Sequence, residues 1–306
     1  MRGAAILGRT LLAAAGLAGW AAWAGQWVPV LDALASLAPI LGAAAVLGAL
    51  LCWRRPVVAI AGLVVALTPA VLMIAPEWLR TIPAAAPGAP PVRIVTHNVW
   101  VENADPAETA QTIVDANADV VLLQEMNGRF RPMLAALRQH YAYGTDCPPG
   151  CGLAILSRWP IGDRDYFFRD PAGRRIGPAL VWAQIRPAGM PPFTVASLHY
   201  PHPLPVAGQA RRRAALAQAV ARIDSRSLVI AGDMNLTPWA AAMRDQDRAL
   251  APMTRMTRAL ASWRRPLPML PIDHLYAGPA WGLIGARRLA ATGSDHFPLL
   301  ITLGRR

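Results

Sequence analysis

The stretch LVIAGDMNLTPW, Leu228 to Trp239, is an apolar run that ends in two polar side chains. Its opening residues are apolar and partly β-branched, which predicts a buried strand over Leu228–Ala231. Asp233 and Asn235 follow that strand on either side of Met234, so both side chains point to the same side of an extended chain. An aspartate or asparagine after a strand usually serves a turn. Taken alone, the stretch leaves a structural and a functional interpretation open.

Polar side chains also follow the other apolar runs in the distal part of the chain. Further strands are expected at residues 92–96, 120–123, 153–156, 179–185, 193–198, 274–277 and 299–302. The polar residues at these strand ends are His97, Asn98, Glu125, His199, His202, Asp273, Ser294, Asp295 and His296. One such residue is ordinarily a turn or surface residue. Their recurrence from strand to strand favours one shared functional site.

Helices are expected between these strands. Asp105 is a good helix N-cap, Pro106 suits the first helical position, and Glu108 predicts a capping box. This helix is expected to reach Ala116, and a second one is expected over Gln209–Ile223. Because strands outnumber helices, the pattern predicts an α/β fold of two sheets packed face to face with helices outside.

The first 75 residues have a different composition. The whole chain of 306 residues is 54% apolar, and the first 75 residues carry only five charged side chains. A bilayer-spanning helix needs about 20 apolar residues, and the segments 10–28, 33–53 and 57–75 are long enough. A cleaved signal peptide is the alternative for the first segment, but two further spans follow at once. None of the three contains Asp, Glu or His, which argues against a transport pathway.

Flanking charges predict the orientation of these spans. Arg2 and Arg9 precede the first span, Arg54 and Arg55 separate the second from the third, and the first loop has no Arg or Lys. The positive-inside rule therefore places the N-terminus in the cytoplasm and everything after Ala75 on the far side. The Ala- and Arg-rich composition without Lys favours a bacterial source, so the expected location is the inner membrane with a periplasmic distal domain.

The remaining composition defines the expected domains and partners. Residues 1–75 are the predicted anchor, the Pro/Ala-rich residues 76–91 a semi-rigid linker, and residues 92–306 the distal domain. Residues 92–306 carry 25 Arg and 16 acidic residues, which gives a net charge of +9. A basic domain suits nucleic acid, phospholipid head groups or polyphosphate, and a solvated Arg-rich surface is the alternative. The run Arg211–Arg213 allows the same two interpretations, and no protein partner is predicted.

The cysteines fit an extracytoplasmic domain. Cys147 and Cys151 frame the sequence CPPGC, which is compatible with a disulfide in an oxidising compartment. A metal site is the alternative, but two cysteines without nearby partner ligands are too few for zinc. Cys52 lies within the second span.

The ordered motifs HNVW, LLQE, SLH, GDMN, IDH and SDHFP, between His97 and Pro298, resemble the endonuclease/exonuclease/phosphatase superfamily. The resemblance covers essentially all of residues 92–306. It implies a four-layered α/β sandwich and Mg²⁺-dependent cleavage of phosphate esters, with Mn²⁺ as a substitute. Members include deoxyribonucleases, abasic-site endonucleases, neutral sphingomyelinases and inositol polyphosphate 5-phosphatases. A nuclease-like activity fits the basic charge, and a phospholipid or head-group phosphodiesterase or phosphatase fits the tether.

The resemblance also implies a metal site and an activated water. Glu125 resembles the main metal ligand, with Asn98 beside it and Asp295 close by. Carboxylate and amide oxygens are the ligands that Mg²⁺ prefers. Asp233 resembles the general base, and Asn235 is expected to hold water or phosphate by hydrogen bonds.

Histidines complete the implied site. His296 resembles the histidine that contacts the phosphate, and Asp273 is expected to fix its tautomer and favour the imidazolium. His199 resembles the second histidine, which contacts phosphate or protonates the leaving group. The implied substrate-binding residues are Asn98, Asn235, His199 and His296.

The chain departs from the family pattern in two places. Trp100 stands where many relatives carry an acidic residue, so fewer protein ligands are expected at the metal. The segment CPPGCG lacks the Tyr or Glu that some relatives use as a proton donor, and Asp146 is a possible stand-in. These losses keep a catalytically inactive, membrane-anchored binding module as an alternative. His202 is an alternative to His199, and His97 and His274 are interpreted as structural or peripheral.

Overall fold

The computed structural model describes residues 2–145, 150–264, 266 and 269–306. Its contacts divide the chain into two compact units. The first comprises Met1–Arg80, Pro203–Val206 and Leu236–Asp245, and the second comprises Thr81–His202, Ala207–Asn235 and Gln246–Arg306. Asp146 and Cys147 lie outside the described residues. The role of Asp146 and the Cys147–Cys151 disulfide therefore stay predictions.

The first unit is built on three apolar helices that pack against one another in pairs. They are α1 (Arg2–Ala24), α2 (Ala38–Leu51), which continues from the 3₁₀ helix η1 (Pro29–Leu37), and α3 (Pro56–Leu79). The segments Arg2–Ala24, Pro29–Leu51 and Pro56–Leu79 are each long and apolar enough to cross a membrane. The bounds differ from the predicted windows: α1 begins and ends earlier than 10–28, η1 and α2 together cover residues 29–51 rather than 33–53, and α3 extends past 57–75 at both ends. Hydropathy alone does not define where a helix begins or ends.

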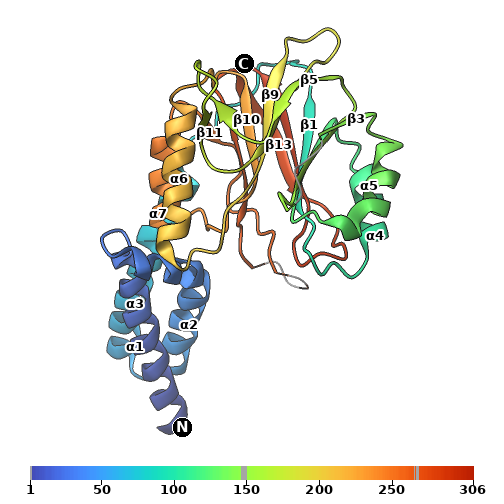
Figure 1. The fold of residues 1–306 in the computed structure, drawn as a ribbon. Coiled ribbons are helices and arrows are strands. Elements are labelled where there is room, and N and C mark those ends of the chain that lie inside the picture. The colour runs from blue at the N-terminus through green and yellow to red at the C-terminus, as the bar shows by residue number, and fades with distance from the viewer. Residues whose placement is uncertain (1, 146–149, 265, 267–268) are drawn as a thin grey trace. The chain divides into compact units, whose positions relative to one another are not determined.

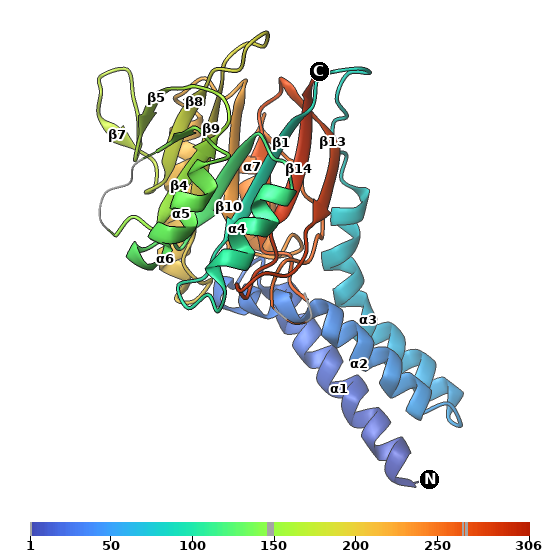
Figure 2. The same ribbon diagram turned by 90° about the vertical axis from the view of Figure 1, so that its right-hand side faces the viewer.

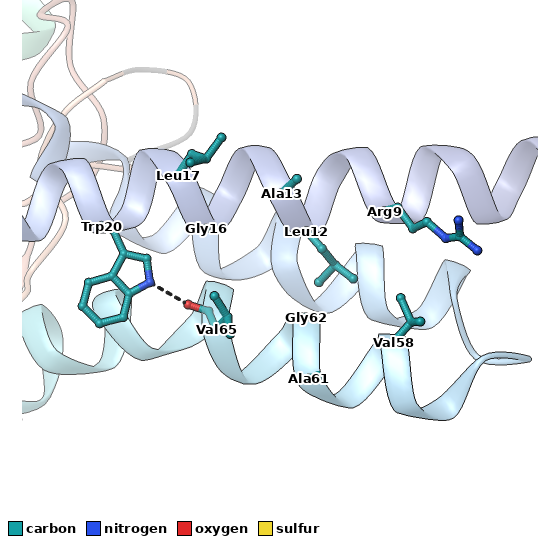
Figure 3. A pocket seen from close by; sticks show the side chains of 10 residues that line it. All are labelled: Arg9, Leu12, Ala13, Gly16, Leu17, Trp20, Val58, Ala61, Gly62 and Val65. Carbon is teal, nitrogen blue, oxygen red and sulfur yellow. Dashed lines mark hydrogen bonds between the residues drawn. The ribbon is translucent and has the colours of Figure 1, made fainter.

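Close packing of α1 on α3 satisfies a backbone group that a proline has freed. Pro69 has no N–H, so the carbonyl of Val65 loses its ordinary helical partner. The indole Nε1 of Trp20 donates to that carbonyl at 3.1 Å. Gly19 permits the approach, since a Cβ there would lie 2.8 Å from the Cγ of Pro69. An apolar groove of about 690 Å³ runs beside this contact, with Arg9 at one end (Figure 3).

The second unit contains two six-stranded mixed sheets and a small two-stranded one. The first sheet has the order β13-β14-β1-β2-β4-β3, and the second β11-β12-β10-β9-β8-β5. The first is formed by β13 (Trp281–Arg288), β14 (Leu299–Arg305), β1 (Val92–Asn98), β2 (Val120–Gln124), β4 (Leu153–Ser157) and β3 (Tyr143–Gly144). The second is formed by β11 (Thr254–Arg255), β12 (Asp273–Ala277), β10 (Leu228–Asp233), β9 (Phe193–His199), β8 (Val181–Ile185) and β5 (Ile161–Asp165). The small sheet pairs β6 (Phe168–Arg169) with β7 (Arg175–Ile176).

Helices cover the outer faces of both large sheets (Figures 1 and 2). Residues from the two inner faces, such as Leu122 and Val229, form the central core. On the outer face of the first sheet, α4 (Pro106–Asp115) and α5 (Arg131–Arg138) bury Ile113 and Met133. The second sheet is covered by α6 (Val206–Val220) and by the latter part of α7 (Ala241–Ala249). The predicted four-layered α/β sandwich, preceded by three long apolar helices, is confirmed.

Strand pairing brings the polar strand ends together. β1 and β2 run parallel, with Asn98 opposite Gln124. β9 and β10 are also parallel, and Asp233 lies opposite His199. β12 is antiparallel to β10 and begins with Asp273, which also lies opposite Asp233. Side chains that are far apart in sequence therefore meet at one edge of the sandwich.

The N-cap predicted for α4 is formed, but the predicted capping box is not. The Asp105 carboxylate accepts from the backbone N–H of Glu108 at 2.8 Å, as an N-cap does. The reciprocal half of the predicted capping box is not formed, because the N–H of Asp105 donates instead to the Asn103 side chain at 2.8 Å. The helices α5 and α7 were not predicted, nor were the strands β3, β5, β6, β7, β11 and β13. In β13, glycines and arginines interrupt the apolar pattern, and pairing with β14 supplies the missing local preference.

Part of the predicted linker is bonded to the sheet. The carbonyl of Pro83 accepts from Leu283 N–H at 2.8 Å, and Ala86 N–H donates to the carbonyl of Arg305 at 2.9 Å. These bonds extend the edge of the first sheet beyond β13. Residues 83–86 are therefore hydrogen-bonded into the sheet of the second unit, to which they belong. The Pro/Ala composition gave no signal of this pairing, because the pairing is made by backbone groups alone.

β10 and β9 are tightly packed at Gly232, the residue directly before Asp233. A Cβ at Gly232 would lie 1.8 Å from the carbonyl oxygen of Leu198. We expect Gly232→Ala to lower the free energy of unfolding by about 3 kcal/mol, as overpacking of a closed site does. Urea denaturation checks this. Gly208→Ala is the control, since nothing lies within 4 Å of a Cβ there. Equal stability of the two variants would contradict the packing argument.

Candidate active site

The carboxylate of Asp233 lies at the centre of the converging strand ends. Its side chain is only 2% exposed. Its Oδ1 accepts from the backbone N–H of Asn235 at 2.8 Å. Its Oδ2 accepts from Asn98 Nδ2 at 3.0 Å and lies 3.5 Å from His199 Nε2 and 3.6 Å from His296 Nε2. Three polar side chains and one backbone N–H, from strand ends and neighbouring loops, thus face one buried carboxylate.

Glu125 is aimed at the same place by an unusual backbone conformation. It follows β2 directly and has a φ of +60°, in the left-handed region that non-glycine residues seldom adopt. Its Oε1 accepts from Asn98 Nδ2 at 2.8 Å, and its Oε2 accepts from Val101 N–H at 3.1 Å. Trp100 and Asn235, which flank the site, also have positive φ, at +58° and +50°. Backbone strain of this kind clusters at functional sites.

A candidate metal site is formed by Glu125, His199 and Asp233. One ligand atom of each lies within 4.8 Å of the others. Two carboxylates and a partly exposed imidazole fit a divalent cation. The metal ligands predicted from the sequence were Glu125, Asn98 and Asp295, so only Glu125 is common to the two sets. In the structure the amide nitrogen of Asn98 faces the carboxylates, and its oxygen accepts from Trp100 N–H at 2.9 Å.

Asp295 is held beside the site by a tryptophan. Its Oδ2 accepts from Trp263 Nε1 at 2.9 Å, and its Oδ1 lies 4.0 Å from His296 Nε2. Within the part of the chain that the structure describes, Asp295 Oδ1 is buried without a hydrogen-bond partner. A buried oxygen of this kind ordinarily binds water or an ion, so Asp295 fits the edge of a metal site.

His296 is bound to Asp273 through its other ring nitrogen. The distance from His296 Nδ1 to Asp273 Oδ2 is 2.8 Å, and the same oxygen accepts from Ser262 Oγ at 2.6 Å. Burial acts to lower the pKa of His296, but Asp273 and Asp233 raise it to about 10. The ring is therefore an imidazolium at neutral pH, with Nε2 facing Asp233. Despite burial, the His296 ring holds the pKa of Asp273 below its usual value.

Asp233 experiences the opposite shift. Burial raises the pKa of its carboxyl above the usual value, and the nearby His296 offsets this only in part. A carboxylate with a raised pKa accepts a proton more readily than an exposed one. This is the property that a general base requires near neutral pH.

Three other histidines do not join this cluster. His97 is buried, its Nε2 lies 3.3 Å from Thr292 Oγ1, and burial lowers its pKa to about 3. His274 Nδ1 lies 3.1 Å from Thr257 Oγ1. These contacts agree with the structural interpretation of both residues. His202 is exposed, whereas His199 faces the two carboxylates.

Several supporting residues had no signal in the sequence. Ser262 and Trp263 lie in an irregular segment, so nothing local linked them to Asp273 and Asp295. Gln124 belongs to the LLQE motif but had no assigned role. Its Nε2 donates to Ser197 Oγ at 3.0 Å, and Ser197 Oγ donates to Leu123 O at 3.0 Å. This buried link joins the two sheets directly before Glu125 and close to His199.

Comparison with known proteins identifies the family. A sequence model of the endonuclease/exonuclease/phosphatase family matches residues 95–296. The chain belongs to this family. A search of curated proteins gives no significant match. The family's hydrolases act on phosphate esters, and this chain has the family's fold.

Solved structures share the fold at low identity. The endonuclease/exonuclease/phosphatase from Bacteroides vulgatus has a TM-score of 0.57 and 18% identity, covering 71% of this chain and 100% of that one. The one from Beutenbergia cavernae has a TM-score of 0.54 and 19% identity, covering 70% and 72%. D. rerio TDP2, complexed with single-strand DNA product, has a TM-score of 0.56 and 15% identity, covering 70% and 99%.

Removing the Asp273 carboxylate should change how His296 titrates. The folded pKa of His296, about 10, exceeds its ordinary value of 6.5. The resulting stabilisation is complete below pH 6.5 and is lost as the pH rises through about 10. We expect Asp273→Asn to move the midpoint downward and to flatten the fall in unfolding free energy between these limits. NMR titration of the metal-free protein checks this, with exposed Asp224→Asn as control. An unchanged midpoint would exclude Asp273 as the controlling partner.

Proposed function

We propose that the chain is a membrane-tethered, Mg²⁺-dependent phosphoesterase that hydrolyses phosphate esters by in-line attack of water. One observation carries the proposal: Glu125, His199 and Asp233 converge within 4.8 Å, next to the imidazolium of His296. Two acidic ligands and nearby cationic donors suit an anionic phosphate and a hard cation. The alternative of an inactive binding module is less favoured, because these side chains are all present together.

Metal binding is assigned to Glu125, with Asp295 at the edge of the site, while Asp233 and His199 lie close enough to act on water and phosphate bound there. Asn98 keeps Glu125 and Asp233 together through its amide nitrogen, at 2.8 and 3.0 Å. Asn98 would become a metal ligand only if its side-chain amide rotated so that its oxygen faced the carboxylates. When bound, the cation withdraws charge from the phosphate oxygens and stabilises the developing alkoxide.

Proton transfer and phosphate binding are assigned to the other side chains. Asp233, with its raised pKa, accepts the proton of the attacking water. Asn235 holds Asp233 through its backbone N–H at 2.8 Å, and its side-chain amide donates to the carbonyl of Tyr200 at 2.9 Å and to Asp233 Oδ2 at 3.3 Å, so we assign it to holding the base in place. The His296 imidazolium, held by Asp273, donates to a phosphate oxygen. His199, 29% exposed, is the candidate that protonates the leaving group or contacts the phosphate.

Nucleic acid is the first substrate candidate. Residues 92–306 carry a net charge of +9, and Arg211 and Arg212 are exposed on α6. Basic surfaces of this kind attract polyanions. The structurally similar D. rerio TDP2 was solved with a DNA product. A phospholipid or its head group is the second candidate, because three apolar helices are long enough to hold the chain in a bilayer.

Substrate and metal are tested on the full chain in lipid nanodiscs. We expect hydrolysis of bis(4-nitrophenyl) phosphate with Mg²⁺ or Mn²⁺ and none with EDTA. Glu125→Ala should weaken metal binding and lower the rate at least about 100-fold, as loss of a key electrostatic group does. The exposed Glu102→Ala is the matched control. Metal affinity and turnover that survive Glu125→Ala would reject the proposal.

Plasmid DNA and radiolabelled phospholipid then decide between the two substrate classes. Nicking of DNA without loss of lipid phosphate supports the nuclease. Release of head group or phosphate from lipid with intact plasmid supports the second candidate. Both assays use the same nanodisc preparation, so a difference reports substrate preference rather than the state of the protein.

The proposed orientation predicts a periplasmic C-terminus. Arg2, Arg9, Arg54 and Arg55 favour a cytoplasmic N-terminus and second loop. Alkaline phosphatase fused after Arg306 should therefore be active in intact bacteria, and the same fusion after Arg55 should be inactive. The reverse pattern would overturn the orientation and the predicted Cys147–Cys151 disulfide together.

A further inference from the structure

An acidic residue between the first two apolar helices caps a helix of the distal sequence. Asp32 lies in η1, and its Oδ1 and Oδ2 accept from the backbone N–H groups of Ala241 and Ala242 at 2.7 and 2.8 Å. These are amides of the first turn of α7, where the backbone N–H groups precede the regular helical hydrogen bonds. A carboxylate here also complements the positive end of the helix dipole. The cap is supplied from 209 residues away in the sequence.

A second bond holds the same two segments together. The indole Nε1 of Trp239 donates to the carbonyl of Ala35 at 2.7 Å. Trp239 is 4% exposed and Ala35 is fully buried. Gly25, at the end of α1, allows Asp32 to come close, because a Cβ there would lie 2.5 Å from Asp32 Cα. The η1 segment is therefore packed and bonded against residues 239–242 at several points.

The capped helix leads back to the catalytic strand. The segment Leu236–Asp245 begins directly after Asn235 and belongs to the same compact unit as the three apolar helices. One residue further along α7, Gln246 Nε2 donates to the sulfur of Met234 at 3.2 Å. Met234 is buried and lies between Asp233 and Asn235 in the sequence.

The far end of α7 is fixed to a second catalytic strand. Asp247 accepts from the hydroxyl of Tyr276 at 2.5 Å and from Arg255 Nη2 at 2.8 Å. Tyr276 belongs to β12, which begins with Asp273. The helix is thus capped by Asp32 at its first turn and bonded at its end beside the strands that carry Asp233 and Asp273.

We propose that Asp32 is a positioning residue for phosphoester cleavage, and that η1 is part of the catalytic machinery rather than a passive connection between spans. A tether requires only the covalent chain through residues 80–91. The carboxylate cap and the indole bond add a structural dependence that a tether does not need. This inference rests on the proposed function, because it assigns Asp32 to the orientation of Asp233 and Asn235.

The test compares Asp32→Ala, Asp32→Asn and Trp239→Phe in the full chain in nanodiscs. With bis(4-nitrophenyl) phosphate, Asp32→Ala should lower kcat about tenfold, the scale of a lost helix cap, and leave KM nearly unchanged. Asp32→Asn keeps one acceptor and should fall between Asp32→Ala and the native chain. Trp239→Phe keeps the ring but loses the bond to Ala35, and should lower kcat less. Asp224→Ala, which removes a carboxylate from an exposed turn, should stay within twofold.

Two further measurements separate positioning from global instability. The number of Mn²⁺ ions bound per chain should be the same in Asp32→Ala and the native chain. Amide hydrogen exchange should quicken at residues 233–245 and remain unchanged in β1 and β2. A native kcat in Asp32→Ala would overturn the proposal, and so would a loss of kcat matched by an equal loss of Mn²⁺ sites.

Failure of the proposed function gives a different result. In that case the native chain does not hydrolyse any phosphodiester with metal present. The hydrogen-exchange experiment still tests the inference. Unchanged amide exchange at residues 233–235 in Asp32→Ala would show that the Asp32 cap does not influence the backbone around Asp233.

Discussion

The burial of the Asp233 carboxylate is the constraint on which the rest of the site depends. An isolated carboxylate at 2% exposure is costly, and here amide and imidazole groups surround it. Asn98 and the Asn235 N–H donate to it, and the His296 imidazolium lies 3.6 Å away. The groups that compensate the buried charge are the same types of group that bind a phosphate. The side chains that stabilise the buried Asp233 carboxylate are therefore of the same types that phosphate binding requires.

The sandwich can assemble this cluster because two parallel strand pairs end at the same edge. Asn98 and Gln124 are register partners in one sheet, and Asp233 and His199 are partners in the other. The buried Gln124–Ser197 hydrogen bond fixes the sheets to each other next to these ends. Gly232 brings β10 against Leu198 more closely than any side chain allows. Small errors in sheet packing would therefore move Asp233 relative to Glu125.

The sequence was informative wherever the signal was local. Apolar runs ending in Asp, Glu, Asn or His predicted most of the strands and the central residues, since period and strand ends are properties of neighbouring positions. Ser262 and Trp263 could not be predicted, because their roles depend on Asp273 and Asp295 across an irregular segment. β13 was not predicted for a related reason: its glycines and arginines have no local strand preference, and the segment is a strand because it pairs with β14. Glu125 was predicted as a metal ligand, but its positive φ was not predicted.

The bonds of Asp32 show the limit of local signals most clearly. A helix cap is normally sought within a few residues of the helix, yet the cap of α7 lies 209 residues earlier. The entropy of closing such a loop grows only with the logarithm of its length, so distance in sequence is a weak barrier to this contact. The hydrogen bonds need only the carboxylate and the two amides of the first turn to be held in place. Gly25 and the Trp239–Ala35 bond do this, and they join the apolar helices to the segment that follows Asn235 as one structural unit.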